Sequence, residues 1–301
     1  GSGAGFKPVS RETAILLGNV LLLAALATVL LGTLYPLVLD AFDLGKVSIG
    51  PPYFNTVFVP MMAPVLLLLG IAPRLRWGHN RLATVLGGAR WEALAALVLA
   101  GTAPLAFGEF RWQAVLGLGL GGWMVLTTVG SLVTRWREAG FLSLSALGMG
   151  CAHAGLAIGI IGMGLVSAYQ SERAVSMRPG DTATLGAYTF VFKGATEVPA
   201  SNYSAMRASL ELARDGKTLG LLEPEKRLYR SSRTTMTEAA IRYGFLGDVY
   251  GALGEPLPGG AWSVQLYVKP FVGWLWAGAL FMFAGGVLAA LGARRPSEMK
   301  A

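Results

Sequence analysis

The sequence predicts an α-helical integral membrane protein with about six transmembrane helices and a small antiparallel β-rich domain outside the cytoplasm, between the last two helices. Of the 301 residues, 53% are hydrophobic and only 14% are charged, which lies outside the usual range of soluble domains. Six runs are nearly free of charge, and a bilayer core needs about 20 helical residues to be crossed. After the fifth run, hydrophobic and polar residues alternate, as they do in half-buried strands.

The six apolar runs define the expected helices. They are residues 14–39, 57–73, 93–107, 112–134, 141–169 and 270–293. Run 93–107 is short, and run 57–73 contains Pro60 and Pro64, so we expect both helices to include flanking residues or to bend. The expected domains are 1–169 with five helices, 170–269 with the strands, and 270–301 with the sixth helix and a cytoplasmic tail.

The positive charges follow the expected loops. The net charge of +8 suits a nucleic-acid partner in principle, but the basic residues concentrate in every second short segment. These are Lys7, Arg11, Arg74, Arg76, Arg81, Arg90, Arg135, Arg137, Arg294, Arg295 and Lys300. The alternate short loops contain only Lys46 and Arg111. The positive-inside rule then predicts that both termini are cytoplasmic and that 170–269 lies outside.

Segment 170–269 has the pattern of a small antiparallel barrel or sandwich. It contains 12 basic and 10 acidic residues, so nucleic-acid binding is not expected of it. Alternation at 206–212 predicts a strand, and Asp215-Gly216 predicts a hairpin turn into a second strand at 217–222. Further strands are expected at 187–192 and, after the Gly259-Gly260 turn, at 262–268.

Four other features have structural interpretations. The glycines of 117–122 match the spelling GxGxxG, but they lie inside an expected span, so we expect helix packing and not dinucleotide binding. Gly155 and Gly159 repeat the spacing of small residues at helix contacts. Cys151 is the single cysteine and cannot form an intrachain disulfide. Residues 1–8 have no signal-peptide pattern and are expected to be a linker-like lead.

His153, one of two histidines, lies in the middle of the fifth run. An imidazole in hydrocarbon needs a hydrogen-bond partner or a metal. Its helical neighbours include Ala146, Gly150 and Ala157, and a face with such small side chains admits either a second helix or the flat ring of a haem. Both interpretations remain open from the residues alone. His79 lies among the cytoplasmic arginines, where we expect it to be solvated. His153 lies about 15 Å deep in its span at 1.5 Å per residue, so we do not expect His79 to reach it.

The densest charge cluster of the outer segment is at 223–233. Its candidate patch for haem propionates or a protein partner consists of Arg227, Tyr229, Arg230 and Arg233. The alternative is a solvated hairpin rim. The outer segment contains neither His nor Cys, so hydrolytic chemistry is not expected of it.

Several stretches together resemble the carboxy-terminal half of CcmF, the large membrane component of bacterial cytochrome c maturation. They are Val9-Ser-Arg-Glu12, Leu31-Gly-Thr-Leu-Tyr-Pro36, Val47-Ser-Ile-Gly-Pro-Pro-Tyr-Phe-Asn55, Ala152-His153-Ala-Gly155, Glu223-Pro-Glu-Lys-Arg227, Met236-Thr-Glu-Ala239 and 262–270. The resemblance implies ligation of haem to apocytochrome c at the periplasmic side of the inner membrane. It also implies an internal haem b with His153 as an axial ligand of its iron, which passes an electron that keeps the substrate haem ferrous.

The resemblance also implies partners. These are the amino-terminal half of the same protein, a haem chaperone, apocytochrome c with its thiol-handling and chaperone subunits, and membrane lipid. In the family, the tryptophan-rich outer loop, the two histidines beside it and the other axial ligand belong to the amino-terminal half. The chain is therefore expected to be a haem lyase component that is incomplete alone, with 170–269 as a docking module. The alternative class is a transporter or channel subunit with a periplasmic docking domain, because several spans contain proline or glycine.

Overall fold

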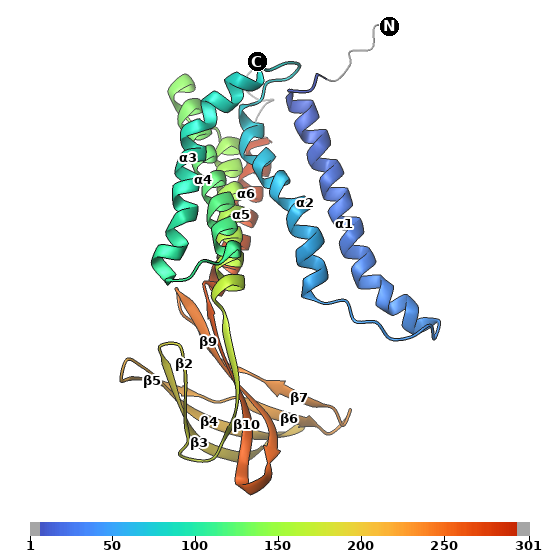
Figure 1. Cartoon of the computed structure of the whole chain (residues 1–301), viewed down its shortest axis with the longest axis vertical. Coiled ribbons are helices and arrows are strands. Elements are labelled where there is room, and N and C mark those ends of the chain that lie inside the picture. Colours follow the sequence, from blue (N-terminus) through green and yellow to red (C-terminus); the bar gives the residue numbers. More distant parts are fainter. Residues whose placement is uncertain (1–6, 294–301) are drawn as a thin grey trace. The chain divides into compact units, whose positions relative to one another are not determined.

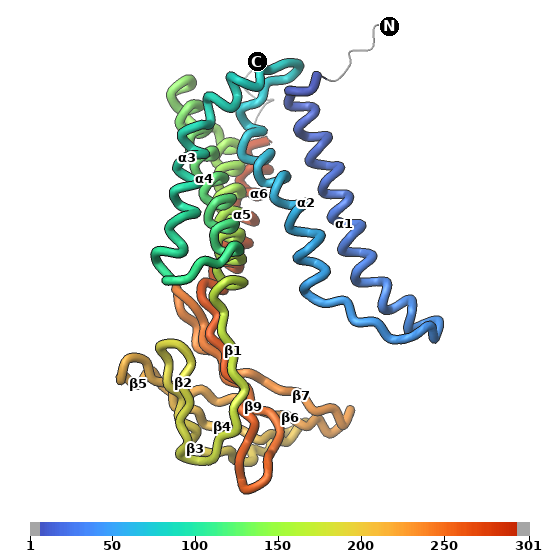
Figure 2. The backbone as a smooth tube through the Cα atoms, viewed as in Figure 1, coloured from blue at the N-terminus to red at the C-terminus, as the bar shows by residue number. Residues whose placement is uncertain are grey.

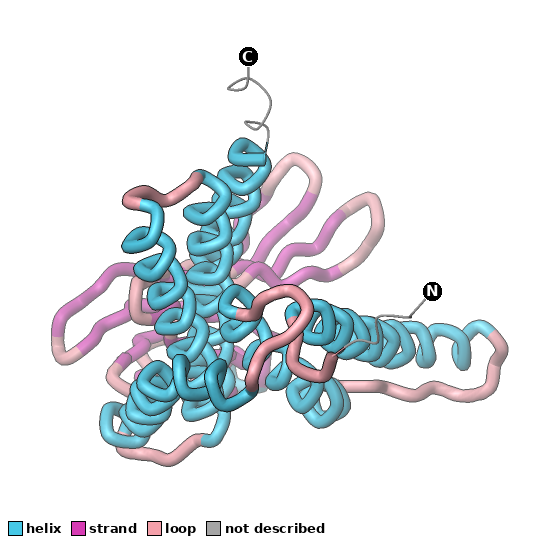
Figure 3. Tube along the Cα trace, turned by 90° about the horizontal axis from the view of Figure 1, so that it is seen from above, coloured by secondary structure: helices cyan, strands magenta, loops and turns pink. Residues whose placement is uncertain are grey.

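The computed structural model describes residues 7–293 and contains two compact units, Gly1–Ile161 with Gly278–Ala301, and Gly162–Ala277. The described residues include six helices that are long and apolar enough to cross a membrane (Figure 1). Every strand of the described chain lies between Ser171 and Pro270 (Figure 3). The predicted fold class is confirmed. Residues 1–6 of the expected lead at 1–8 lie outside the described residues, as do the basic residues Arg294, Arg295 and Lys300.

The membrane unit consists of long helices, and caps mark one end of α1, α3 and α4. They are α1 (Arg11–Ala41), α2 (Pro51–Ile71) with the 3₁₀ turn η1 (Ala72–Arg74), α3 (Leu82–Phe107), α4 (Trp112–Ala139), α5 (Leu144–Tyr169) and α6 (Val272–Ala293). The side chain of Ser10 caps α1 by accepting a hydrogen bond from Thr13 N. Gly108 and Gly140, both left-handed, close α3 and α4. As expected, α2 and α3 include residues that flank the short apolar runs.

Helix α4 lies at the centre of the membrane unit because it contacts three neighbours. Trp123 Nε1 donates a hydrogen bond of 3.2 Å to Leu67 O of α2. A Cβ at Gly122 would lie 3.0 Å from Leu99 of α3, and one at Gly121 would lie 3.0 Å from Ala157 O of α5. The glycines of 117–122 therefore serve helix packing, as predicted.

Helices α5 and α6 contact each other backbone to backbone. A Cβ at Gly148 would lie 2.7 Å from Gly285 O, and a Cβ at Gly155 would lie 2.5 Å from Gly278 O. Such distances leave no room for a side chain, so glycine is required at these crossing points. The close approach fixes the position of α5, the helix that carries His153.

The second unit is an antiparallel sandwich that the chain enters from α5 and leaves into α6 (Figure 2). One sheet has the order β1-β10-β9-β8, and the other has β2-β3-β4-β6-β7 with β5 also paired to β4. The strands are β1 (Ser171–Met177), β2 (Thr182–Leu185), β3 (Tyr188–Pro199), β4 (Tyr203–Arg214), β5 (Lys217–Leu222), β6 (Glu225–Tyr229), β7 (Thr235–Glu238), β8 (Ala240–Arg242), β9 (Gly247–Leu257) and, after the 3₁₀ turn η2 (Pro258–Gly260), β10 (Ala261–Pro270).

The sandwich has its own hydrophobic core. Phe190 and Phe192 of β3 pair with Leu212 and Leu210 of β4, and all four side chains are fully buried. Every strand expected from alternation is present, and the predicted Asp215-Gly216 turn joins β4 to β5. The boundaries expected at 169/170 and 269/270 stay predictions.

Candidate functional site

His153 lies near the middle of α5 and faces α4. Its Nδ1 is 3.3 Å from Oγ1 of Thr128, and the residue is half-buried. Its Nε2 has no hydrogen bond to any residue within 7–293. The face of small side chains around His153 is therefore occupied at least partly by a second helix, while one ring nitrogen stays available.

Thr128 belongs to a polar stripe on α4 that points into the bundle. Thr127 Oγ1 donates to Trp123 O at 2.7 Å, and Ser131 Oγ donates to Thr128 O at 2.8 Å, so both hydroxyls bond within their own helix. The Thr128 hydroxyl instead reaches across to α5. Nothing in the sequence distinguishes a threonine that bonds to a histidine of another helix from one that bonds within its own helix, so the contact of Thr128 with His153 was not predicted.

The arrangement fits one axial ligand of a haem iron. Histidines that bind metals typically bond a second group through the other ring nitrogen, which sets the tautomer and the ring orientation. In such a role Thr128 would be that second group, and Nε2 would be the nitrogen that binds iron. The other histidine, His79, is exposed in the loop before α3, and no group of three or more His, Cys, Asp or Glu residues that could hold a metal lies within 7–293.

Cys151 faces a different helix from His153. Its Sγ donates to Phe281 O of α6 at 3.3 Å. The thiol thus has a structural partner and contributes nothing to the site on the α4 side.

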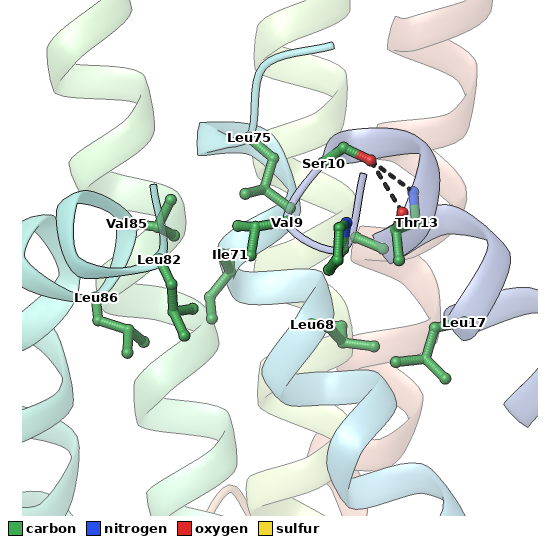
Figure 4. A pocket seen from close by; sticks show the side chains of 12 residues that line it. Val9, Ser10, Thr13, Leu17, Leu68, Ile71, Leu75, Leu82, Val85 and Leu86 are labelled. Carbon is green, nitrogen blue, oxygen red and sulfur yellow. Dashed lines mark hydrogen bonds between the residues drawn. The ribbon is translucent and has the colours of Figure 1, made fainter. Parts of the chain in front are cut away.

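A small pocket at one end of the membrane unit is separate from His153. It has a volume of about 160 Å³ and lies between α1, α2 and α3, lined mostly by leucine and valine (Figure 4). Its polar groups are Ser10 and Thr13, whose hydroxyls bond each other at 3.0 Å. Sites for larger ligands usually measure about 300–1,000 Å³, so this pocket is too small for a haem ring.

The outer face of β4 and β6 holds a carboxylate between two arginines. The Glu225 side chain is only 8% exposed, and it accepts hydrogen bonds from Arg207 Nε at 2.7 Å and Arg227 Nε at 2.8 Å. The bond from Arg227, with that from Arg207, holds the pKa of the Glu225 carboxyl below its ordinary value although burial raises it. Arg227 also lies 4.9 Å from the Tyr203 ring.

The four residues of the predicted charge patch, Arg227, Tyr229, Arg230 and Arg233, have different surroundings in the structure. Arg227 is not a free cation, because Glu225 and Glu238 pair with it. Arg230 and Arg233 are exposed around the turn from β6 to β7, and neither forms an ion pair with a residue in 7–293. Tyr229 packs on Tyr203 with ring centroids 5.5 Å apart. The free cationic part of the patch is therefore Arg230 with Arg233, and its role stays a prediction.

Sequence reasoning missed Arg207 and Tyr203 because they belong to another strand. The pairing of β4 with β6 places Arg207 opposite Glu225 and Tyr203 opposite Tyr229. Arg207 is one of the polar residues that alternate with apolar ones in 206–212, whereas Tyr203 lies before this segment. Only the register of the strands shows what either residue faces.

The chain matches known proteins along nearly its whole length. A family model described as the CcmF C-terminal beta-sandwich matches residues 168–270. Cytochrome c-type biogenesis protein CcmF of Pseudomonas aeruginosa is 43% identical over 99% of this chain and 46% of the relative. CcmF of Escherichia coli K12 is 42% identical over 93% of this chain and 43% of the relative.

A solved structure shares the fold. The protein named Cytochrome c Heme Lyase CcmF superposes with a TM-score of 0.75 at 24% identity, over 94% of this chain and 46% of that one. The chain thus spans about half the length of the curated relatives it matches. These matches, together with six apolar helices and a sandwich before the last one, show that the chain corresponds to the carboxy-terminal region of the CcmF family of cytochrome c-type biogenesis proteins.

Proposed function

We propose that this chain takes part in attaching haem to apocytochrome c at the periplasmic side of the bacterial inner membrane, and that His153 holds an internal haem b. The names of the relatives support a role in cytochrome c biogenesis. The observation that carries the haem proposal is the imidazole itself, bonded to Thr128 through Nδ1 with Nε2 unbonded among the described residues.

The chain's own residues have defined tasks in this proposal. In the proposed tautomer Nδ1 carries the proton and donates a hydrogen bond to Thr128 Oγ1, so Nε2 would present its lone pair to iron. The close contact of α5 with α6 at Gly155 and Gly278 keeps this ring at one depth. A bound haem would supply one-electron chemistry, which keeps the iron of the substrate haem ferrous.

The remaining parts of the machinery lie outside this chain. The proposed partners are the amino-terminal half with the second axial ligand, a haem chaperone, and apocytochrome c with its thiol-handling and chaperone subunits. Arg230 and Arg233 are the proposed docking or propionate-binding groups of the strand domain. The strand segment 170–269 carries a charge of only +2, which supports no nucleic-acid role.

The proposed topology has both termini in the cytoplasm. It is supported by contacts that join two basic segments at one end of the membrane unit. Arg11 N donates to Arg76 O at 3.2 Å, and Asn80 N donates to Val9 O at 2.8 Å. A reporter inserted near Asp215 should be active only as a periplasmic fusion, and cytoplasmic activity there would refute the topology.

The transporter alternative rests on the prolines and glycines in the spans. Helix α2 runs through Pro60 and Pro64 and α3 runs through Pro104 without interruption, so these described spans do not provide the unwound segments that transporters use for binding. A colourless protein that is intact and joined to its amino-terminal half would favour this alternative over ours.

The test of the proposal is His153→Gly in the protein joined to its amino-terminal half. We expect the b-type absorption spectrum to be lost or strongly reduced, because an axial ligand is removed. His79→Gly is the matched control and should keep the spectrum, since His79 is exposed in a loop. A His153→Gly protein with a fully reducible internal haem would show that the ligand assignment is wrong.

A further inference from the structure

The turn between β8 and β9 exposes three large apolar side chains. Tyr243 is 78% exposed, Phe245 is 79% exposed and Leu246 is 62% exposed. No charged residue lies within 243–246. In a water-exposed turn this composition is unusual, because such turns favour Gly, Pro, Asn, Asp and Ser.

Hydrogen bonds hold the turn in a defined conformation. Gly244 N donates to Oδ1 of Asp248 at 3.0 Å, and Gly247 N donates to Gly244 O at 3.2 Å. Asp248 is only 5% exposed, so its carboxylate is committed to this turn. The tip therefore presents its aromatic side chains in a defined arrangement.

The same turn is attached to the first residues of α6. Phe271 N donates to Leu246 O at 3.0 Å, and Trp274 Nε1 donates to Phe245 O at 3.2 Å. The rings of Phe245 and Trp274 lie 5.9 Å apart. All these residues belong to the same compact unit, Gly162–Ala277.

This attachment sets the depth of the turn. Helix α6 begins at Val272 and is one of the six candidate spans, so Trp274 lies about 3 Å into it at 1.5 Å per residue. Taking the start of α6 as the start of the span, a turn bonded to Trp274 lies near the edge of the hydrocarbon core. Tyr and Trp are enriched at this level because one end of the ring is apolar and the other is polar.

A cation lies close to the same level. Lys269 Nζ is 5.2 Å from the Tyr250 ring and 5.5 Å from the Tyr267 ring, three residues before α6 begins. An ammonium held there suits the phosphate of a lipid headgroup, since long basic side chains near span ends extend to the interface. Apolar, aromatic and cationic groups thus lie together near the start of α6, and this combination is typical of a bilayer interface.

We propose that the turn 243–246 is a lipid-binding tip, whose Tyr243, Phe245 and Leu246 insert into the headgroup and upper acyl region of the bilayer. The insertion is shallow, about 5–10 Å as for other interfacial elements. It anchors the strand domain beside the start of α6, independently of any haem bound by the membrane unit.

The test is the depth of a spin label on the whole chain in nanodiscs of phosphatidylcholine and phosphatidylglycerol. Phe245→Cys is labelled in a Cys151→Ala background, and Ser232→Cys, in the exposed turn after β6, is the aqueous control. We expect label 245 to collide several-fold more often with oxygen than with a water-soluble nickel complex, and label 232 to show the opposite ratio. Tyr243→Cys gives a second label site if Phe245→Cys does not fold.

Two results would overturn the proposal. Equal nickel accessibility at 245 and 232 would place the turn in water. Exclusion of both reagents from labels 243 and 245 would show that protein and not lipid covers the turn. The same measurement in native membrane vesicles decides whether the result holds when the chain's partners are present.

Discussion

Replacing Gly285 by alanine should weaken the contact between α5 and α6. A Cβ at Gly285 would lie 2.6 Å from Gly148 O and 2.8 Å from Ala152 Cα. Ordinary contacts of a Cβ begin at 3.4 Å, so the carbonyl oxygen of Gly148 must retreat by about 0.8 Å. That movement displaces the backbone of α5 next to His153.

The expected magnitude follows from two opposing effects. Overpacking a close-packed site costs about 1–3 kcal/mol. Alanine returns at most about 1 kcal/mol, because it is a better helix former than glycine. The free energy of unfolding of the membrane unit should therefore fall by up to about 2 kcal/mol, and by about 1–3 kcal/mol relative to a variant that gains helix propensity without overpacking.

The assay is unfolding of the chain in mixed detergent micelles, followed by circular dichroism. Gly286→Ala is the matched control, because a Cβ at Gly286 meets no atom within 4 Å. The control gains helix propensity without overpacking, so it should be as stable as the original chain or slightly more stable. A Gly285→Ala protein as stable as Gly286→Ala would refute the close packing of α5 on α6.

Three further predictions address the two candidate sites. Hydrogen bonds from arginine lower the pKa of Glu225, so the ionised carboxylate contributes its full stability above the ordinary pKa of 4.5, and this stability is lost as the pH falls through the lower pKa of the folded state. Glu225→Gln should therefore lower the melting temperature at pH 7 and make stability less dependent on acid pH. An unchanged dependence of stability on acid pH would contradict the assignment. Arg230→Ala with Arg233→Ala should weaken capture of substrate haem or a partner in pull-downs while the internal haem spectrum stays intact, and normal cytochrome c maturation would reduce the patch to a solvated rim. Thr128→Val should lower retention of the internal haem about 10–100-fold, as losses of such supporting bonds do, whereas Thr128→Ser should restore it, and equal retention in both would remove Thr128 from the site.

The number and order of the helices could be predicted because apolar composition alone decides them. Their ends could not, and α3 shows why. The structure starts α3 at Leu82, whereas the charge-free run began at residue 93. Arg74 Nη2 and Glu92 Oε1 form an ion pair of 2.6 Å, so a charged residue lies within a span with its partner beside it. A rule that ends a span at each charged residue does not take into account that Arg74 compensates the charge of Glu92.

The candidate site was predictable only in part for a similar reason. His153 could be found from the sequence because a histidine is costly in hydrocarbon and therefore rare there. Thr128 lies 25 residues earlier on another helix, and nothing in its spacing shows that it faces α5. Glu225 belongs to the charge cluster predicted at 223–233, but its bond to Arg207 depends on the register of β4 with β6.

Different interactions stabilise the two units, so substitutions in the two units have different effects. The strand domain buries large side chains such as Phe190 and Leu212, so its stability depends on side-chain volume. The α5–α6 contact depends on the absence of side chains at Gly148, Gly155 and Gly285. A glycine substitution there changes where His153 stands without altering its chemistry, whereas Thr128→Val changes the chemistry without moving the helix. Comparing the haem spectra of the two kinds of variant therefore distinguishes a ligand that is misplaced from one that is present but poorly oriented.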